Sequence, residues 1–128
     1  MRYLLDSHIF VWLFARPSLV GDKTKSTLAM SDSEAYVSLA TLWELELKFT
    51  EGRFAYSAKD LQNAMLDLGV YDLNISKDHI LASSLTKIAH TDPFDLMLCA
   101  QATAEDMVLV TADQKLLDTY PNSIDARL

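Results

Sequence analysis

Flexible and cross-linking residues are scarce in this chain. Its 128 residues include only three Gly, three Pro and one Cys, while half of them are apolar. This composition excludes a disordered or low-complexity chain and predicts one domain with a real hydrophobic core. The lone Cys99 has no partner for an internal disulfide, so we expect a small core residue in a reducing cytoplasm.

Long apolar runs are also missing. No run approaches the roughly 20 apolar residues that a membrane-spanning helix needs. The first residues carry one charge, at Arg2, and no cleavage-site pattern, which argues against a secretory signal. We therefore expect a cytoplasmic protein without a membrane segment.

Basic residues are outnumbered by acidic ones, 11 to 18, which gives a net charge of −7. Phosphate contacts need cations, so an acidic chain is not an obvious nucleic-acid binder. It can still act on a polyanion if metal ions fill an acidic pocket and a basic rim attracts the substrate. The candidates for that rim are Arg16, Lys23, Lys25, Lys48, Arg53 and Lys59.

Short apolar runs alternate with helical patterns along the chain. The candidate strands are residues 3–5, 35–39, 70–75 and 107–111, with an edge strand near Ile124. The candidate helices are residues 8–14, 23–31, 40–50, 56–68, 77–88, 93–105 and 113–120. This alternation predicts an α/β fold: a central parallel sheet flanked by helices on both faces, without repeats or linkers.

Two of these helices carry strong apolar patterns. Residues 40–50 are apolar almost all round, so we expect this helix to be well buried. Ser76 is a candidate N-cap for the helix that follows it. The apolar stripe of that helix comprises Ile80, Leu81, Leu85 and Ile88.

Two aspartates follow strands. The apolar run Tyr3-Leu4-Leu5 ends at Asp6, and Asp113 comes just after the strand that ends near Thr111. In open α/β sheets, ligands bind at the carboxyl ends of the strands. Each aspartate has an equally good structural explanation, because Asp is favoured at a helix N-cap.

Two further acids fall in the first turns of predicted helices. Glu44 has Lys48 four residues later, and such a pair contributes only about 0.2–0.5 kcal/mol when exposed. Asp95 follows Asp92-Pro93, where Asp92 suits an N-cap and Pro93 the first helical position. Asp95 also heads a face that carries Cys99, and an acid over an apolar face is costly without a polar or charged partner.

The predicted sheet brings Asp6, Glu44, Asp95 and Asp113 to one edge. Crowded carboxylates repel one another, and a divalent cation is the usual physical remedy. No Cys and His residues occur at zinc-ligand spacing, so the expected ion is Mg²⁺ or Mn²⁺. Two such ions about 4 Å apart would activate a water and stabilise the leaving oxygen of a phosphodiester.

Four stretches, in the same order along the chain, resemble the PIN-domain family, and most closely the VapC-type toxins of toxin–antitoxin pairs. The first is Leu4-Leu5-Asp6-Ser7-His8 with Trp12-Leu13, and the second is Val37-Ser38-Leu39 with Leu42-Trp43-Glu44-Leu45, continued by Lys48 and Gly52-Arg53. The third is His90-Thr91-Asp92-Pro93-Phe94-Asp95, and the fourth is Leu109-Val110-Thr111-Ala112-Asp113. The resemblance covers the chain end to end and implies a single PIN-like domain over residues 1–128.

The resemblance also implies an activity, a site and partners. The activity is Mg²⁺- or Mn²⁺-dependent cleavage of RNA by an endoribonuclease, and the partners are a small basic antitoxin protein and a second copy of the chain. Asp6, Glu44, Asp95 and Asp113 match the acidic quartet of the family, while Thr111 and Asp92 match accessory positions. Leu96 stands where many relatives carry a basic residue.

Two non-enzymatic functions compete with this interpretation. A phosphoryl-accepting receiver domain also has acids at strand ends and binds Mg²⁺, but Asp6 has no acidic neighbour and Ala112 follows Thr111 where a Lys is expected. An inactive PIN fold that serves only as a binding partner agrees with the whole sequence.

Overall fold

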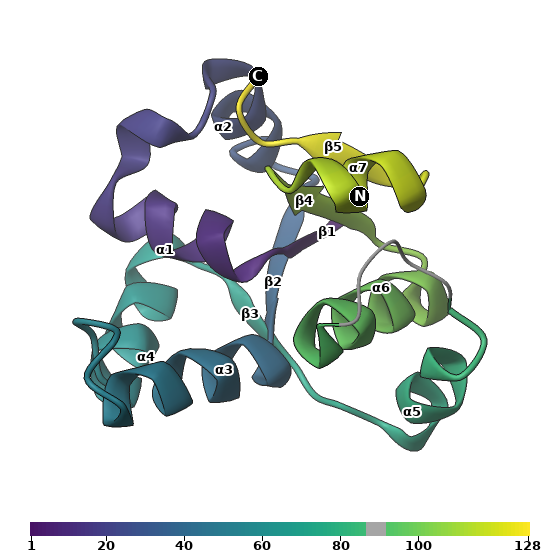
Figure 1. The fold of residues 1–128 in the computed structure, drawn as a ribbon. Helices are drawn as coiled ribbons and strands as arrows, with labels where there is room; N and C mark the ends of the chain where they lie inside the picture. The colour runs from purple at the N-terminus through teal and green to yellow at the C-terminus, as the bar shows by residue number, and fades with distance from the viewer. Residues whose placement is uncertain (87–91) are drawn as a thin grey trace.

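The computed structural model describes residues 1–86 and 92–128. Within these residues, five strands form one sheet in which every neighbouring pair is parallel. The strands are β1 (Arg2–Leu5), β2 (Glu34–Ser38), β3 (Tyr71–Leu73), β4 (Val108–Thr111) and β5 (Ser123–Asp125). Their order across the sheet is β3-β2-β1-β4-β5, so β1 is the central strand (Figure 1). The predicted α/β class and the edge strand near Ile124 are confirmed.

Seven α-helices and one 3₁₀ turn connect the strands in the described part of the chain. They are α1 (Ser7–Ala15), η1 (Pro17–Leu19), α2 (Asp22–Leu28), α3 (Leu39–Thr50), α4 (Ala58–Leu68), α5 (Lys77–Ser83), α6 (Pro93–Glu105) and α7 (Gln114–Thr119). The helix predicted over 77–88 ends at Ser83, and Ile88 lies outside the described residues, as do His90 and Thr91.

The sheet has a hydrophobic cluster on each face. Along β1, Leu5 packs with residues of α1, α3 and α4, whereas Leu4 packs with residues of α6 and α7. This alternation follows from the two-residue period of a strand. β1 lies between β2 and β4, and its carboxyl end leads directly into α1 (Figure 1).

The strand order places a topological switch at the centre of the sheet. From β1 the chain moves outward through β2 to β3, then returns to place β4 on the other side of β1. Open α/β sheets bind ligands in the crevice at such a switch, outside the carboxyl ends of the strands. The order also differs from the 2-1-3-4-5 order of the receiver-type fold, so the receiver interpretation is wrong.

The structure corrects the predicted burial of α3. Trp43 is 61% exposed, and Leu47 and Phe49 are also exposed, so this helix is not well buried. Its buried residues are Ala40, Thr41 and Leu45, which form one narrow stripe. Apolar composition indicated burial on all sides, but Trp43, Leu47 and Phe49 lie outside the stripe that is buried in the core.

The apolar stripe predicted for α5 is wrong for the same reason. Ile80, Leu81 and Leu85 are exposed, with Leu81 at 67%. The buried residue of this helix is His79, whose Nδ1 accepts the backbone N–H of Ser76 and whose Nε2 lies 3.1 Å from Oε1 of Glu105. Polar contacts therefore hold α5 against α6.

No helix of the described residues is long and apolar enough to cross a membrane.

Candidate functional site

Asp6 lies at the carboxyl end of β1 and caps α1, so both of its predicted placements are correct. The residue is only 3% exposed, and its carboxylate accepts hydrogen bonds at both oxygens. Oδ1 accepts the backbone N–H of Ser7 at 2.7 Å, and Oδ2 accepts the hydroxyl of Thr111 at 2.7 Å. The backbone N–H of Asp6 donates to the carbonyl oxygen of Val110. These bonds fix the carboxylate between β1 and β4.

Thr111 connects Asp6 to Asp113. Its hydroxyl donates to Asp6 and accepts the backbone N–H of Asp113 at 3.0 Å. Asp113 is the N-cap of α7, where its Oδ1 accepts the backbone N–H of Lys115. Asp113 thus has its predicted position beyond the carboxyl end of β4, and Thr111 is the residue that couples the two strand ends.

Glu44 is the sixth residue of α3, so its predicted place in the first turn is wrong; the helix begins at Leu39, before the expected start. The side chain is 14% exposed, and its Oε2 lies 3.3 Å from Nζ of Lys48. The predicted Glu44–Lys48 pair therefore exists, but on a largely buried carboxylate rather than a solvated helix face.

Asp92 and Asp95 begin α6 as predicted. Oδ1 of Asp92 accepts the backbone N–H groups of Phe94 and Asp95 at 2.8 and 3.1 Å. Asp95 heads the face that carries Cys99, which is completely buried. Burial, followed by the charges of Asp95 and Asp6, raises the pKa of the Cys99 thiol to about 12.

The negative charges of the other candidate acids act on Asp95. Its pKa is raised from 3.8 to about 7, first by burial and then by the negative charges of four other carboxylates. Those carboxylates belong to Asp6, Asp92, Glu44 and Asp113. Because such repulsion weakens with distance, Asp95 lies within electrostatic range of the other predicted acids.

An aromatic contact that sequence reasoning missed joins two of these helices. The rings of Trp43 on α3 and Phe94 on α6 meet edge to face, with centroids 5.7 Å apart. Each ring belongs to the residue directly before an acid, Glu44 or Asp95. The sequence signal for this contact was the aromatic residue that stands directly before the acid in both motifs.

The donor set of this edge suits a hard divalent cation, because it consists of carboxylate oxygens that repel one another. In residues 1–86 and 92–128, however, no three acidic, His or Cys side chains are grouped closely enough to hold a metal ion. The carboxylates of Asp6, Glu44 and Asp92 are instead turned to protein donors. A metal site here therefore requires side-chain rotations.

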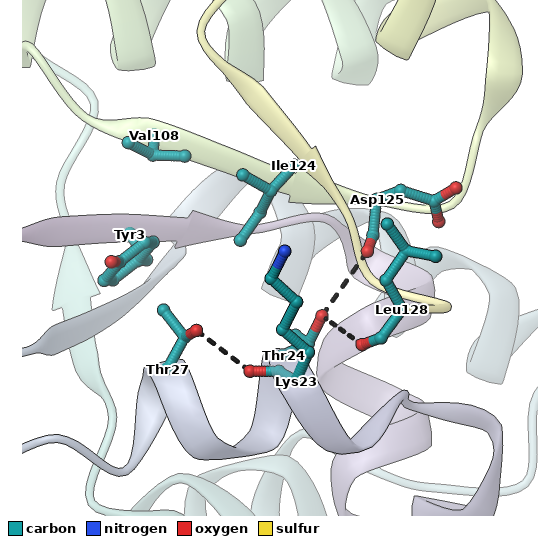
Figure 2. A pocket seen from close by; sticks show the side chains of 8 residues that line it. All are labelled: Tyr3, Lys23, Thr24, Thr27, Val108, Ile124, Asp125 and Leu128. Carbon is teal, nitrogen blue, oxygen red and sulfur yellow. Dashed lines mark hydrogen bonds between the residues drawn. The ribbon is translucent and has the colours of Figure 1, made fainter.

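A separate cavity of about 330 Å³ lies between α2 and the sheet (Figure 2). Tyr3, Val108 and Ile124 form its apolar wall, while Lys23 and Thr27 reach it from α2. None of the candidate acids lines this cavity. It is therefore distinct from the acidic edge at the carboxyl ends of β1 and β4.

Comparison with known proteins identifies the family. The model of the PIN domain matches residues 3–121. This chain belongs to the PIN-domain family. No curated protein matches it.

Several solved structures share the PIN fold along the whole chain. VapBC2 from Rickettsia felis, bound to a DNA fragment from its promoter, has 19% identity and a TM-score of 0.70, covering 97% of this chain and 96% of that one. VapBC-1 from nontypeable Haemophilus influenzae has 18% identity and a TM-score of 0.69, covering 100% of both chains. A toxin–antitoxin complex from Klebsiella pneumoniae has 20% identity and a TM-score of 0.66, covering 97% of both.

The raised pKa of Asp95 makes the stability of this PIN domain depend on pH. The Asp95 carboxyl has a pKa of 3.8 in the unfolded chain and of about 7 in the folded chain. Between these pH values the folded state therefore binds a proton that the unfolded state has released. The contribution of Asp95 to the free energy of unfolding therefore falls as pH rises from 3.8 to about 7. Urea unfolding in EDTA should show this slope in the wild type and a weaker one in Asp95→Asn. The exposed Asp67→Asn is the matched control, and equal slopes in wild type and Asp95→Asn would exclude the shift.

Thermal melts test for a shared metal site without substrate. Mn²⁺ should raise the melting temperature of the wild type by binding the native state. Asp6→Asn should melt higher than the wild type in EDTA, because one repelling charge is lost, and should gain less from Mn²⁺. Asp67→Asn should respond to Mn²⁺ as the wild type does. An equal shift in all three proteins would mean that the carboxylates do not form a shared site.

Proposed function

We propose that this PIN domain is an Mg²⁺- or Mn²⁺-dependent endoribonuclease and the toxin of a toxin–antitoxin pair. The observation that carries the proposal is the placement of Asp6 and Asp113 at the carboxyl ends of β1 and β4, where the hydroxyl of Thr111 connects them, and the raised pKa of Asp95 supports it. A domain that only binds a partner has no need to collect mutually repelling acids around a half-buried carboxyl.

The residues that would hold the ion are Asp6, Glu44, Asp95 and Asp113, with Asp92 in an accessory position. When bound, the ion supplies an activated water and stabilises the negative charge that develops on the phosphate oxygens. All of these residues offer oxygen ligands, in agreement with a hard cation.

The protein's own contribution is to hold these acids in place. Thr111 donates to Asp6 and accepts from the backbone of Asp113, so it orients one carboxylate and positions the loop of the other. Lys48 neutralises Glu44 while no cation is bound.

The toxin assignment rests on the fold and on the surface of the chain. The Klebsiella pneumoniae neighbour is named as a toxin–antitoxin complex, and the other two carry the name VapBC, the name of a family of toxin–antitoxin systems to which VapBC-5 from Mycobacterium tuberculosis, a further neighbour, belongs. Exposed apolar residues on α3 and α5 lie on a protein with a net charge of −7. Such a surface suits a small basic antitoxin with an apolar face, and a second copy of the chain. The same assignment places the protein in the cytoplasm.

One observation favours a second candidate, an inactive PIN fold that acts only by binding. The carboxylates of Asp6 and Glu44 already have protein donors, and no ready-made ligand group exists in the described residues. Cleavage assays separate this candidate from the nuclease.

Substitution of the acids should abolish RNA cleavage. Asp6→Asn and Asp95→Asn should each lose at least about 10²-fold in rate, as when a single electrostatic stabiliser of a transition state is removed, and Glu44→Gln should behave likewise. Asp92→Asn should mainly weaken the cap of α6, by about 1 kcal/mol or less. The assay is cleavage of single-stranded RNA in Mg²⁺ and in EDTA, with Asp67→Asn as control. Near-wild-type cleavage by both aspartate variants would refute the assignment.

The partner is tested in the cell. Expression of the chain alone should arrest growth, and co-purification from the native host should recover a small basic protein that relieves the arrest. Asp6→Asn should be harmless yet still bind that protein. A wild-type chain that purifies alone and is harmless would instead support the binding module.

A further inference from the structure

A small pocket of about 200 Å³ lies directly beside the candidate acids. Aromatic rings from α1 and from the loop after α3 line it, together with two cationic side chains. The residues on which the argument depends are Ser7, His8, Trp12, Lys48, Arg53 and Phe54. Neither the family match nor any of the neighbours assigns a role to this pocket.

The pocket shares its walls with the acidic edge. Ser7 donates to Asp6 through its backbone N–H, and Lys48 pairs with Glu44. Both residues also line the pocket. The pocket and the acids are therefore adjacent, and one strand of nucleic acid can contact both.

The aromatic lining suits the flat face of a base. His8 and Trp12 lie one turn apart on α1, with ring centroids 6.4 Å apart and planes tilted by 55°. The two rings therefore do not stack on each other, and the ring of His8 is exposed. Aromatic side chains of this kind bind unpaired bases by stacking, with little dependence on sequence.

The two cations suit the phosphate that accompanies that base. Nζ of Lys48 makes one contact with Glu44 at 3.3 Å, and an ammonium has three N–H donors. Arg53 contacts Glu51 through Nε and one terminal nitrogen, which leaves further N–H groups of the guanidinium for a second acceptor. In a chain with a net charge of −7, two cations beside the acids form a local site for a polyanion.

We propose that this pocket binds one base of single-stranded RNA next to the cleaved phosphodiester, while Lys48 and Arg53 contact the adjoining phosphate. The pocket is smaller than the roughly 300–1,000 Å³ that enclose drug-sized ligands, so it takes one ring system and leaves the sugar and phosphate outside. The inference rests on the proposed ribonuclease function and names how its substrate is held.

Binding of a fluorescein-labelled single-stranded RNA, followed by anisotropy in Ca²⁺, tests the two parts separately. His8→Ala should weaken binding by about 5-fold or more, the loss of one stacked base. Arg53→Gln should lower the slope of log Kd against log salt concentration by about 0.7, the value for one phosphate contact to a single strand. Both side chains are exposed, so melting temperatures should stay near the wild type.

Two control variants match these changes outside the pocket. Tyr71→Ala removes an exposed ring from the edge strand β3, and Lys77→Gln removes an exposed charge at the start of α5. Neither should alter the affinity or the salt slope. Tryptophan fluorescence adds a direct probe: in Trp43→Phe, Trp12 is the one remaining Trp of the two in the chain, and the RNA should quench its emission. A His8→Ala change in that background should reduce the quenching.

The outcomes separate this inference from the function on which it rests. If the wild type cleaves RNA but His8→Ala and Arg53→Gln bind like the controls, the pocket inference is wrong and the nuclease assignment stands. If the wild type neither binds nor cleaves RNA, both the proposed function and the pocket inference are wrong. If the two variants bind RNA normally but lose a co-expressed partner protein, the pocket serves that protein and the inference is overturned.

Discussion

Repulsion among carboxylates at the carboxyl ends of β1 and β4 is the constraint to which the rest of the site responds. Asp6 is buried, Asp95 is half-buried, and the charges of four neighbouring acids act on Asp95. The fold manages this repulsion with N–H and O–H donors aimed at individual carboxylates. The hydroxyl of Thr111 and the backbone N–H of Ser7 hold Asp6, and the ammonium of Lys48 holds Glu44.

Such an arrangement lowers the stability of the folded chain. Each acid is tolerable alone because it caps a helix or has a partner, but together they raise the free energy of the folded, metal-free chain. The strand order makes the grouping possible, since the crevice between β1 and β4 receives side chains from both layers of helices. A cation that neutralises these acids would stabilise the same fold that the acids destabilise.

Two further surface features are exposed apolar side chains and a small pocket lined by rings and cations. Apolar side chains remain exposed on α3 and α5, and aromatic rings and cations line the small pocket formed by α1 and the loop after α3. Exposed apolar surface favours another macromolecule, whereas rings combined with cations favour a nucleic acid.

The sequence by itself determined the alternation of strands and helices and the positions of the caps. Asp6, Asp92 and Asp113 cap helices as expected, and α6 runs from Pro93 to Glu105 as predicted. These features depend on a few consecutive residues: a strand ends where its apolar run ends, and a cap needs only its own side chain and the next turn. The family match at residues 3–121 agrees with this local pattern.

Only the tertiary structure decided how distant segments meet. Sequence periodicity cannot tell an apolar face that packs on the core from one that meets solvent, which is why the predicted burial of α3 and α5 was wrong. The edge-to-face contact of Trp43 with Phe94 and the shift in the pKa of Asp95 require helices separated by about fifty residues to pack side by side. Such contacts depend on three-dimensional packing and solvent exclusion, and no local sequence pattern encodes either.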